Sequence, residues 1–291
     1  MKPARFAYER PGDLAGLLAR MATAEGSVKL MAGGQSLGPM LNLRLVEPDL
    51  VLDITGIPEL RRAAIEGDTL VLGALVTHAD IEDGRVPDLT GGAMARVAAA
   101  IAYRPVRNRG TIGGSLVHAD PAADWVTALI ALGAEVELAS ASGRRRLALE
   151  AFVTGALDVA LAPGEMLVAV RIPALPSGTA WGYVKHCSKI GEFAHAIGAV
   201  RIEPGAARAR LVIGAIERAP LVVAEARDLF GGRIGPDFAE RFDARAAEAF
   251  LRDAGMSDPV ARHVHVTVLA RAVAQAASAP PSRTRTVSEA A

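Results

Sequence analysis

Hydrophobic positions in the first part of the chain alternate between short continuous runs and helical spacing. Runs at 6–8, 28–31 and 50–54 predict strands, and the third run is apolar enough to be buried on both faces, as parallel strands are. Between the first two runs, leucine and methionine recur at i, i+3, i+4 and i+7, which predicts a helix from Pro11 to about Ala24. The order strand, helix, strand predicts a β-α-β unit.

The middle of the chain has the pattern of a β-hairpin followed by helices. Two β-like runs at 60–65 and 69–75 flank the turn Glu66-Gly67-Asp68. The pattern then predicts a helical turn over 78–83 capped by Thr77, a small-residue helix over 92–102, a polar loop over 103–109, a helix capped by Asp120 that runs to Leu132, and strands at 135–138, 145–149 and 166–172.

A Pro/Ser/Gly segment, 173–178, predicts a domain boundary. Beyond it, β-like runs at 180–185, 194–202 and 207–217 predict a three-stranded antiparallel meander, and helical patterns follow at 221–229, 236–254 and 260–277. The expected fold class is α+β. The expected domains are 1–175, with subdomains of about 1–57 and 58–175, then 178–280, and a disordered tail at 281–291.

Composition narrows the functional classes. The 291 residues carry a formal net charge of +0 and the basic residues are scattered, so we expect no electrostatic attraction to nucleic acid or to an anionic membrane. The single cysteine, Cys187, excludes an internal disulfide and an iron–sulfur cluster held by this chain alone. No apolar run has the length of a membrane span, and the first residues do not resemble a signal peptide. We therefore expect a cytoplasmic protein.

Two glycine-rich turns are the strongest functional signal. The first, Ala32 to Leu37, follows a strand and precedes a helix start, and the second, Thr111 to Ser115, repeats the same arrangement. Glycines let backbone amides approach an anion closely, so two such turns could grip the two phosphates of a dinucleotide. A plain connecting turn is the alternative for each turn taken alone. Neither has the G-x-G-x-x-G spacing of a Rossmann site for NAD.

Other constellations carry less information. The six histidines are scattered, and the pair His263 and His265 diverges on either a strand or a helix, so we expect no metal site. Ser36 and Ser115 lack the G-x-S-x-G context of a hydrolase nucleophile. His118 either lines a site beside the second turn or only caps a helix.

The two turns resemble the paired pyrophosphate motifs of the flavin-binding medium subunit of molybdenum hydroxylases, the carbon monoxide dehydrogenase and xanthine dehydrogenase type. Similar features continue at Asp53-Ile54, at 120–124 and at 185–191, so the resemblance covers about residues 1–280. It implies an FAD-binding domain of the vanillyl-alcohol-oxidase or p-cresol-methylhydroxylase (PCMH) type, with two α/β subdomains. A C-terminal domain of a three-stranded antiparallel sheet and helices would follow.

The resemblance also implies roles for particular residues. FAD would be held by Ala32, Gly33, Gly34, Gln35, Ser36 and Leu37 of the first turn and by Thr111, Ile112, Gly113, Gly114 and Ser115 of the second. Asp124 would hydrogen-bond a ribityl or ribose hydroxyl, with Asp120 doing the same or only capping a helix. Lys185 would lie near the flavin pyrimidine edge, the alternative being a solvated strand residue.

This chain departs from the family pattern at three positions. Gln35 stands where many relatives have His, and Ser115 stands where many have Asn; both keep hydrogen-bonding capacity. Phe193 stands where relatives place a tyrosine beside the flavin. It can stack on a ring but has no hydroxyl, and it could equally be a core residue.

The resemblance implies an electron-transfer subunit. A large molybdopterin-binding subunit would carry the substrate chemistry, and a small subunit with two [2Fe-2S] clusters would pass electrons to FAD here, in a dimer of heterotrimers. FAD would then reduce an outside acceptor. The alternatives are a self-sufficient flavin oxidoreductase of the same fold and a non-catalytic nucleotide-binding subunit.

Overall fold

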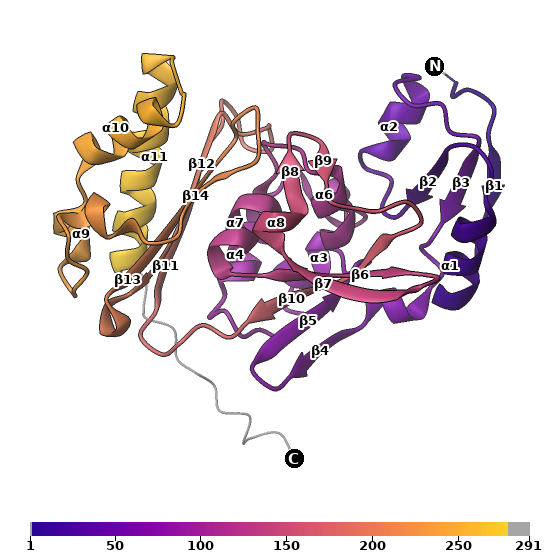
Figure 1. Cartoon of the computed structure of the whole chain (residues 1–291), viewed down its shortest axis with the longest axis horizontal. Helices are drawn as coiled ribbons and strands as arrows, with labels where there is room; N and C mark the ends of the chain where they lie inside the picture. Colours follow the sequence, from indigo (N-terminus) through magenta and orange to yellow (C-terminus); the bar gives the residue numbers. More distant parts are fainter. Residues whose placement is uncertain (1, 279–291) are drawn as a thin grey trace.

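The computed structural model describes residues 2–278, so the predicted tail at 281–291 lies outside the described residues. The chain begins with the predicted β-α-β unit (Figure 1). Strands β1 (Ala7–Glu9), β2 (Val28–Met31) and β3 (Leu50–Asp53) form a parallel sheet in the order β1-β3-β2, and α1 (Leu14–Thr23) connects the first two. Asp13 caps α1 by accepting a hydrogen bond from the Gly16 amide at 2.7 Å. The short helix α2 (Leu37–Asn42) follows the first glycine turn.

A larger antiparallel sheet occupies the middle of the molecule. Its order is β4-β5-β10-β6-β7, so the late strand β10 inserts between the two hairpins. The strands are β4 (Ala63–Glu66), β5 (Thr69–Gly73), β6 (Glu135–Ser140), β7 (Gly143–Ala148) and β10 (Met166–Pro173). One face packs on α1 of the first unit, since Leu14 and Leu17 share a buried cluster with Ala139 and Val168.

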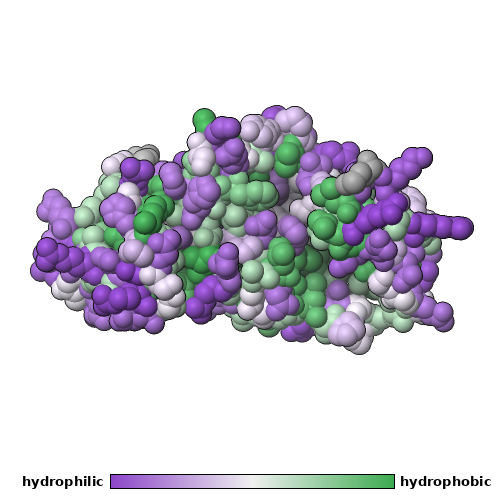
Figure 2. Space-filling model, turned by 90° about the horizontal axis from the view of Figure 1, so that it is seen from above, coloured by the Kyte–Doolittle hydropathy of each residue, from purple (hydrophilic) through white to green (hydrophobic). Residues whose placement is uncertain are grey.

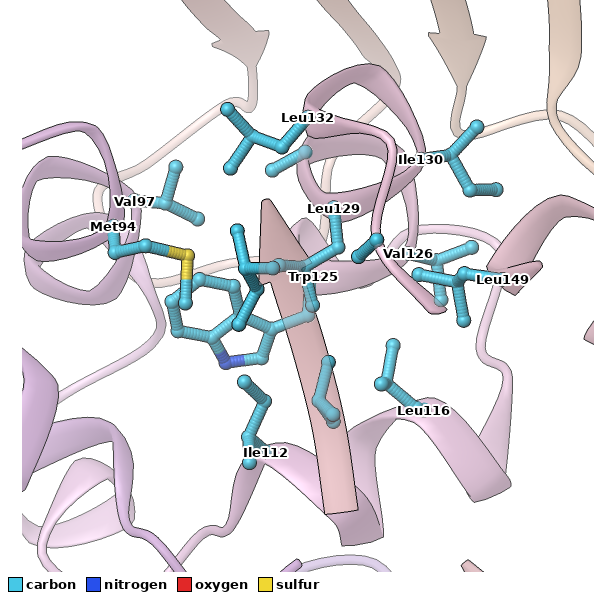
Figure 3. Close-up of a cluster of buried hydrophobic side chains, with 14 of the residues drawn as sticks. Met94, Val97, Ile112, Leu116, Trp125, Val126, Leu129, Ile130, Leu132 and Leu149 are labelled. Carbon is cyan, nitrogen blue, oxygen red and sulfur yellow. The ribbon is translucent and has the colours of Figure 1, made fainter. Parts of the chain in front are cut away.

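Helices cover the other face of this sheet (Figure 1). They are α3 (His78–Glu82), α4 (Ala93–Ala100), α5 (Arg104–Arg107), α6 (Ile112–His118) and α7 (Asp124–Leu132). Trp125 of α7 is fully buried among Met94 of α4 and Ile112 and Leu116 of α6 (Figure 3). The short elements η1 (Pro58–Arg61), α8 (Leu149–Phe152) and the hairpin β8 (Val153–Gly155) with β9 (Asp158–Val159) complete this part.

The C-terminal part is an antiparallel sheet between helices. Its order is β11-β12-β13-β14, from β11 (Ala180–His186), β12 (Ala196–Glu203), β13 (Arg208–Gly214) and β14 (Leu221–Val223). On β12, Ile197 and Ala199 pack in the cluster of α7, whereas Val200 and Ile202 pack toward α11 (Pro259–Ser278). The remaining elements are η2 (Pro204–Ala206), η3 (Ala226–Phe230), α9 (Phe238–Arg241) and α10 (Ala244–Asp253).

Close contacts fix this sheet against α7. A Cβ added to Gly214 of β13 would lie 1.9 Å from Oγ1 of Thr127, so only a glycine allows the approach. At the other end of α7, Arg201 donates to the carbonyl of Leu132 at 3.0 Å and Arg210 to that of Ile130 at 3.2 Å. Cations at the last carbonyls of a helix stabilise its C-terminus.

Three local predictions were wrong. Asp120 does not cap the helix: its carboxylate accepts from the Ala122 amide at 2.8 Å in a turn, and α7 begins only at Asp124. Residues 104–107 form the helical turn α5 instead of loop, with Pro105 in its first turn. The helix predicted over 221–229 is strand β14 followed by η3, so the predicted three-stranded sheet gains a fourth strand. Pairing with β13 outweighs the local helical pattern there.

Candidate cofactor site

A cavity of about 850 Å³ lies between β2 and the helices above the central sheet, within the roughly 300–1,000 Å³ of ligand pockets. Its walls come from both glycine turns, from residues 157–167 and from β11 with the turn that follows it. Of the predicted residues, it is lined by Ala32, Gly33, Gly34, Gln35, Ser36, Leu37, Thr111, Gly113, Gly114, Ser115, Asp120, Asp124, Lys185 and Phe193. Ile112 lies beneath them in the core. Seen from above, apolar residues gather over the middle of the molecule (Figure 2).

The two glycine turns touch each other through Arg109 and Gly110, which lead directly into the second turn, although Arg109 lies 76 positions after Gly33. A Cβ on Gly33 would lie 1.9 Å from the carbonyl oxygen of Arg109 and 3.0 Å from Cα of Gly110. In return, Nε of Arg109 donates to the carbonyl of Gly33 at 3.4 Å, and Gln35 donates to the same oxygen at 3.2 Å. Gly33 therefore serves the contact between the turns, and its missing side chain leaves room for the other turn instead of for a ligand.

The first turn has free hydrogen-bond donors. Gly34 has a φ of +70°, which favours glycine, and its carbonyl accepts from the Gly38 amide at 3.1 Å as α2 begins. Ser36 precedes α2 without using its hydroxyl as a cap. Within residues 2–278, the amides of 33–36 donate to no protein acceptor. Unpaired amides on a turn that lines a cavity suit an anionic ligand.

The second turn is built differently, because its amides are already used. The amides of Ile112 and Gly113 donate to the carbonyls of Val76 at 2.9 Å and Ala74 at 3.1 Å. The amide of Gly114 donates to Oγ1 of Thr111 at 3.1 Å, which caps α6. What this turn offers the cavity is the close approach of its backbone at Gly114 and the hydroxyl of Ser115, which makes no hydrogen bond among the described side chains.

Asp124 and Lys185 meet at the cavity wall as a buried ion pair. Nζ of Lys185 lies 2.9 Å from Oδ1 and 3.1 Å from Oδ2 of Asp124, and it also donates to the carbonyl of Ala100 at 2.7 Å. The hydroxyl of Tyr183 donates to Asp124 at 2.7 Å. Burial raises the pKa of Asp124, while Lys185 and Tyr183 act against that rise. Burial also raises the pKa of Tyr183 well above its ordinary value.

Exposed apolar side chains lie at one edge of the cavity and next to it. Phe193 is 72% exposed and Ile190 is 88% exposed, so neither is a core residue. Tyr103 packs on the backbone of the same turn, since a Cβ on Gly191 would lie 2.7 Å from its ring. Phe193 therefore lines the cavity from its rim.

Sequence reasoning did not identify His78 and the wall at 157–167. His78 lies behind the second turn, and its Nδ1 accepts a hydrogen bond from Nε1 of Trp125 at 3.0 Å. His78 and Trp125 are 47 positions apart in the chain, so no local sequence pattern predicts their hydrogen bond. Leu157 has a φ of +58° and its amide donates to the carbonyl of Ala119, which places the β8–β9 hairpin against α6.

Some kinds of site are absent from the part of the chain that the structure describes. In residues 2–278 no cluster of at least three His, Cys, Asp or Glu side chains could hold a metal ion. Over the same range, none of the helices has both the length and the hydrophobicity to cross a bilayer.

Comparison with known proteins agrees with this geometry. Residues 4–175 match the family described as the FAD binding domain in molybdopterin dehydrogenase. The carbon monoxide dehydrogenase medium chain of Hydrogenophaga pseudoflava is 37% identical over 196 residues, 67% of this chain and 68% of that one. The nicotine 6-hydroxylase medium subunit of Paenarthrobacter nicotinovorans is 34% identical over 262 residues, 86% and 88% of the two chains.

The solved structures include quinoline 2-oxidoreductase from Pseudomonas putida 86, with a TM-score of 0.83 and 31% identity over 95% of this chain and 98% of that chain. The predicted α+β fold with an FAD-binding domain is thus confirmed. The chain belongs to the FAD-binding family of molybdopterin dehydrogenases, and it is a flavoprotein oxidoreductase subunit of the medium-chain type with FAD as its cofactor.

Proposed function

We propose that this chain is the electron-transfer subunit of a heteromeric molybdenum hydroxylase. It would take electrons from the [2Fe-2S] clusters of a small partner subunit and pass them to an external acceptor, while a large subunit with the molybdenum cofactor transforms the substrate. The observation that carries the proposal is the cavity between two touching glycine turns, which opens beside exposed apolar side chains. FAD, when bound, supplies the redox chemistry; the chain supplies position and electrostatics.

The residues present fit such a cofactor. We propose that the free amides of 33–36 and the hydroxyl of Ser36 bind the diphosphate from one side, with Gly114 and Ser115 approaching from the other. Residues 1–175 would form the FAD-binding domain, and 178–280 would close the cavity through Lys185 and Phe193.

The ion pair of Asp124 and Lys185 gives the proposed flavin end a fixed polar wall. Since Asp124 offsets its charge, we propose that Lys185 acts toward the cofactor as a paired hydrogen-bonding group and not as a free cation. We propose that the ion pair fixes the positions of both side chains, so that their hydrogen-bonding atoms are already in place when the cofactor binds. Asp120, held in its turn by the Ala122 amide, would contact the ribityl chain or only order that turn.

The rim of the cavity supports the partner assignment. Electrons pass efficiently only when a cluster comes near the flavin, so a partner must cover part of the rim. Tyr103, Ile190 and Phe193 are exposed there, and exposed apolar groups of this kind are typical of interaction surfaces. We therefore propose that the small subunit covers this rim in a dimer of heterotrimers, in the cytoplasm.

The test is to isolate the tagged chain from its native host and identify every chain and cofactor that stays with it. We expect one FAD per chain, with a larger and a smaller chain that hold molybdenum and iron. Chemical reduction of the iron–sulfur clusters should then bleach the flavin absorption within the complex. A chain that is isolated without flavin would contradict the proposal. Turnover of a small substrate by the single chain would instead support the self-sufficient oxidoreductase.

A further inference from the structure

His78 is a buried histidine at the back of the cavity. It is 5% exposed, it lines the cavity, and it begins α3 directly after the capping residue Thr77. Its amide donates to the carbonyl of Gly110 at 3.0 Å, and a Cβ on Gly110 would lie 2.8 Å from Nε2 of the ring. The edge of the ring that carries Nε2 therefore borders the second glycine turn.

The hydrogen bond to Trp125 fixes which ring nitrogen carries the proton. An indole N–H can only donate, so Nδ1 of His78 must be the acceptor in the 3.0 Å bond between them. In the neutral ring the proton then belongs to Nε2. Burial, with a smaller effect of the Arg107 charge, lowers the pKa of His78 to about 4, so the ring is neutral at physiological pH.

The donor at Nε2 has no acceptor in the protein. Within residues 2–278, no protein atom lies in hydrogen-bond position for it, although the Nδ1 side of the same ring is satisfied. Buried donors in native proteins are nearly always paired, with protein, water or ligand. Since the ring lines the cavity, the partner that remains for this N–H is water or a ligand in the cavity.

We propose that His78 is a ligand-binding residue, whose Nε2–H donates a hydrogen bond to an oxygen atom of the bound flavin nucleotide beside the second glycine turn. This rests on the proposed function, since it takes the flavin nucleotide as the occupant. It also complements the second turn, whose amides at Ile112, Gly113 and Gly114 are used within the chain. Trp125 acts as the positioning residue that sets the ring's tautomer and orientation.

The test compares FAD affinity in two variants with the wild-type chain. His78→Met fills the site without a donor and should weaken FAD binding about tenfold, the value of one net hydrogen bond. His78→Gln keeps an acceptor for Trp125 and a donor toward the cavity, so it should recover most of that loss.

A second readout separates contact from mere support of the turn. The Nε2–H resonance of His78, followed by NMR in the wild-type chain, should shift when FAD is added. An unchanged resonance or an unweakened His78→Met variant would overturn the proposal. A wild-type chain that binds no flavin would overturn the proposed function itself, which keeps the two failures distinguishable.

Discussion

Replacing Gly33 by alanine tests the contact between the two glycine turns. The new Cβ would start 1.9 Å from the carbonyl oxygen of Arg109, and real Cβ contacts essentially never fall under 3.0 Å, so the turns must separate by at least 1.1 Å. The atoms that the new Cβ would meet are backbone atoms of Arg109 and Gly110, so no flexible side chain can move aside to relieve the clash. The change therefore widens the gap across which both turns would hold the diphosphate.

A displacement of about 1 Å at a positioned site can cost on the order of 100-fold. We expect the dissociation constant for FAD to rise by about that factor in Gly33→Ala, and the free energy of unfolding of the flavin-free chain to fall by about 1–3 kcal/mol through overpacking. The assay is titration of flavin-free protein with FAD, followed by flavin fluorescence, together with denaturant unfolding of the same sample.

Gly38→Ala is the matched control. It lies five residues away on α2, and nothing would come within 4 Å of its Cβ. Alanine is the better helix former by about 0.5–1 kcal/mol, so this variant should bind FAD normally and be no less stable. If Gly33→Ala bound FAD with wild-type affinity, the reasoning about the contact between the turns would be refuted.

Three further changes probe other contacts. Asp124→Asn should destabilise the chain by about 3 kcal/mol in denaturant unfolding, because it leaves the buried ammonium of Lys185 without its counter-charge; wild-type stability would contradict this. The folded-state pKa of His78, about 4, lies below its ordinary 6.5, so the unfolded chain binds the proton more readily and the free energy of unfolding should fall by about 3 kcal/mol as the pH drops through that window; His78→Gln should lose this part of the pH dependence. Gly214→Ala should lower stability by about 1–3 kcal/mol, because its Cβ would start 1.9 Å from Thr127, and a melting temperature equal to the wild type would speak against it.

Local patterns predicted much of the fold. The apolar run at 28–31 is strand β2 as predicted, and the helical spacing after Pro11 gives α1 at Leu14–Thr23. The failures lie where a distant partner decides the structure. Residues 221–223 become a strand because β13 offers an edge, and a single sequence does not show that edge. Aspartate is a common capping residue, yet the carboxylate of Asp120 accepts from the Ala122 amide in a turn that precedes α7, so it does not cap that helix.

For the site, the sequence singled out residues that line one cavity, but it did not show the contacts between them. Asp124 and Lys185 were each assigned to the cofactor, and the structure shows that they first bind each other across 61 residues. The sequence places Gly33 in a turn that could bind phosphate, and the structure adds that its missing side chain leaves room for the carbonyl of Arg109. The sequence does not identify His78, because its position and its tautomer depend on hydrogen bonds with Gly110 and Trp125, and neither residue is near it in sequence. Such pairwise relations appear only after the chain has folded.

Helix α7 has a consequence for any attempt to divide the protein. Its first residue, Asp124, depends on Lys185 and Tyr183, and its last carbonyls receive Arg201 and Arg210, all from beyond residue 178. A fragment that stopped at 175 would keep both glycine turns and yet lose every one of these partners. The fragment would thus carry an unpaired buried carboxylate at the start of α7 and would lack both arginine donors at its end, so the folding of the first domain depends on the second.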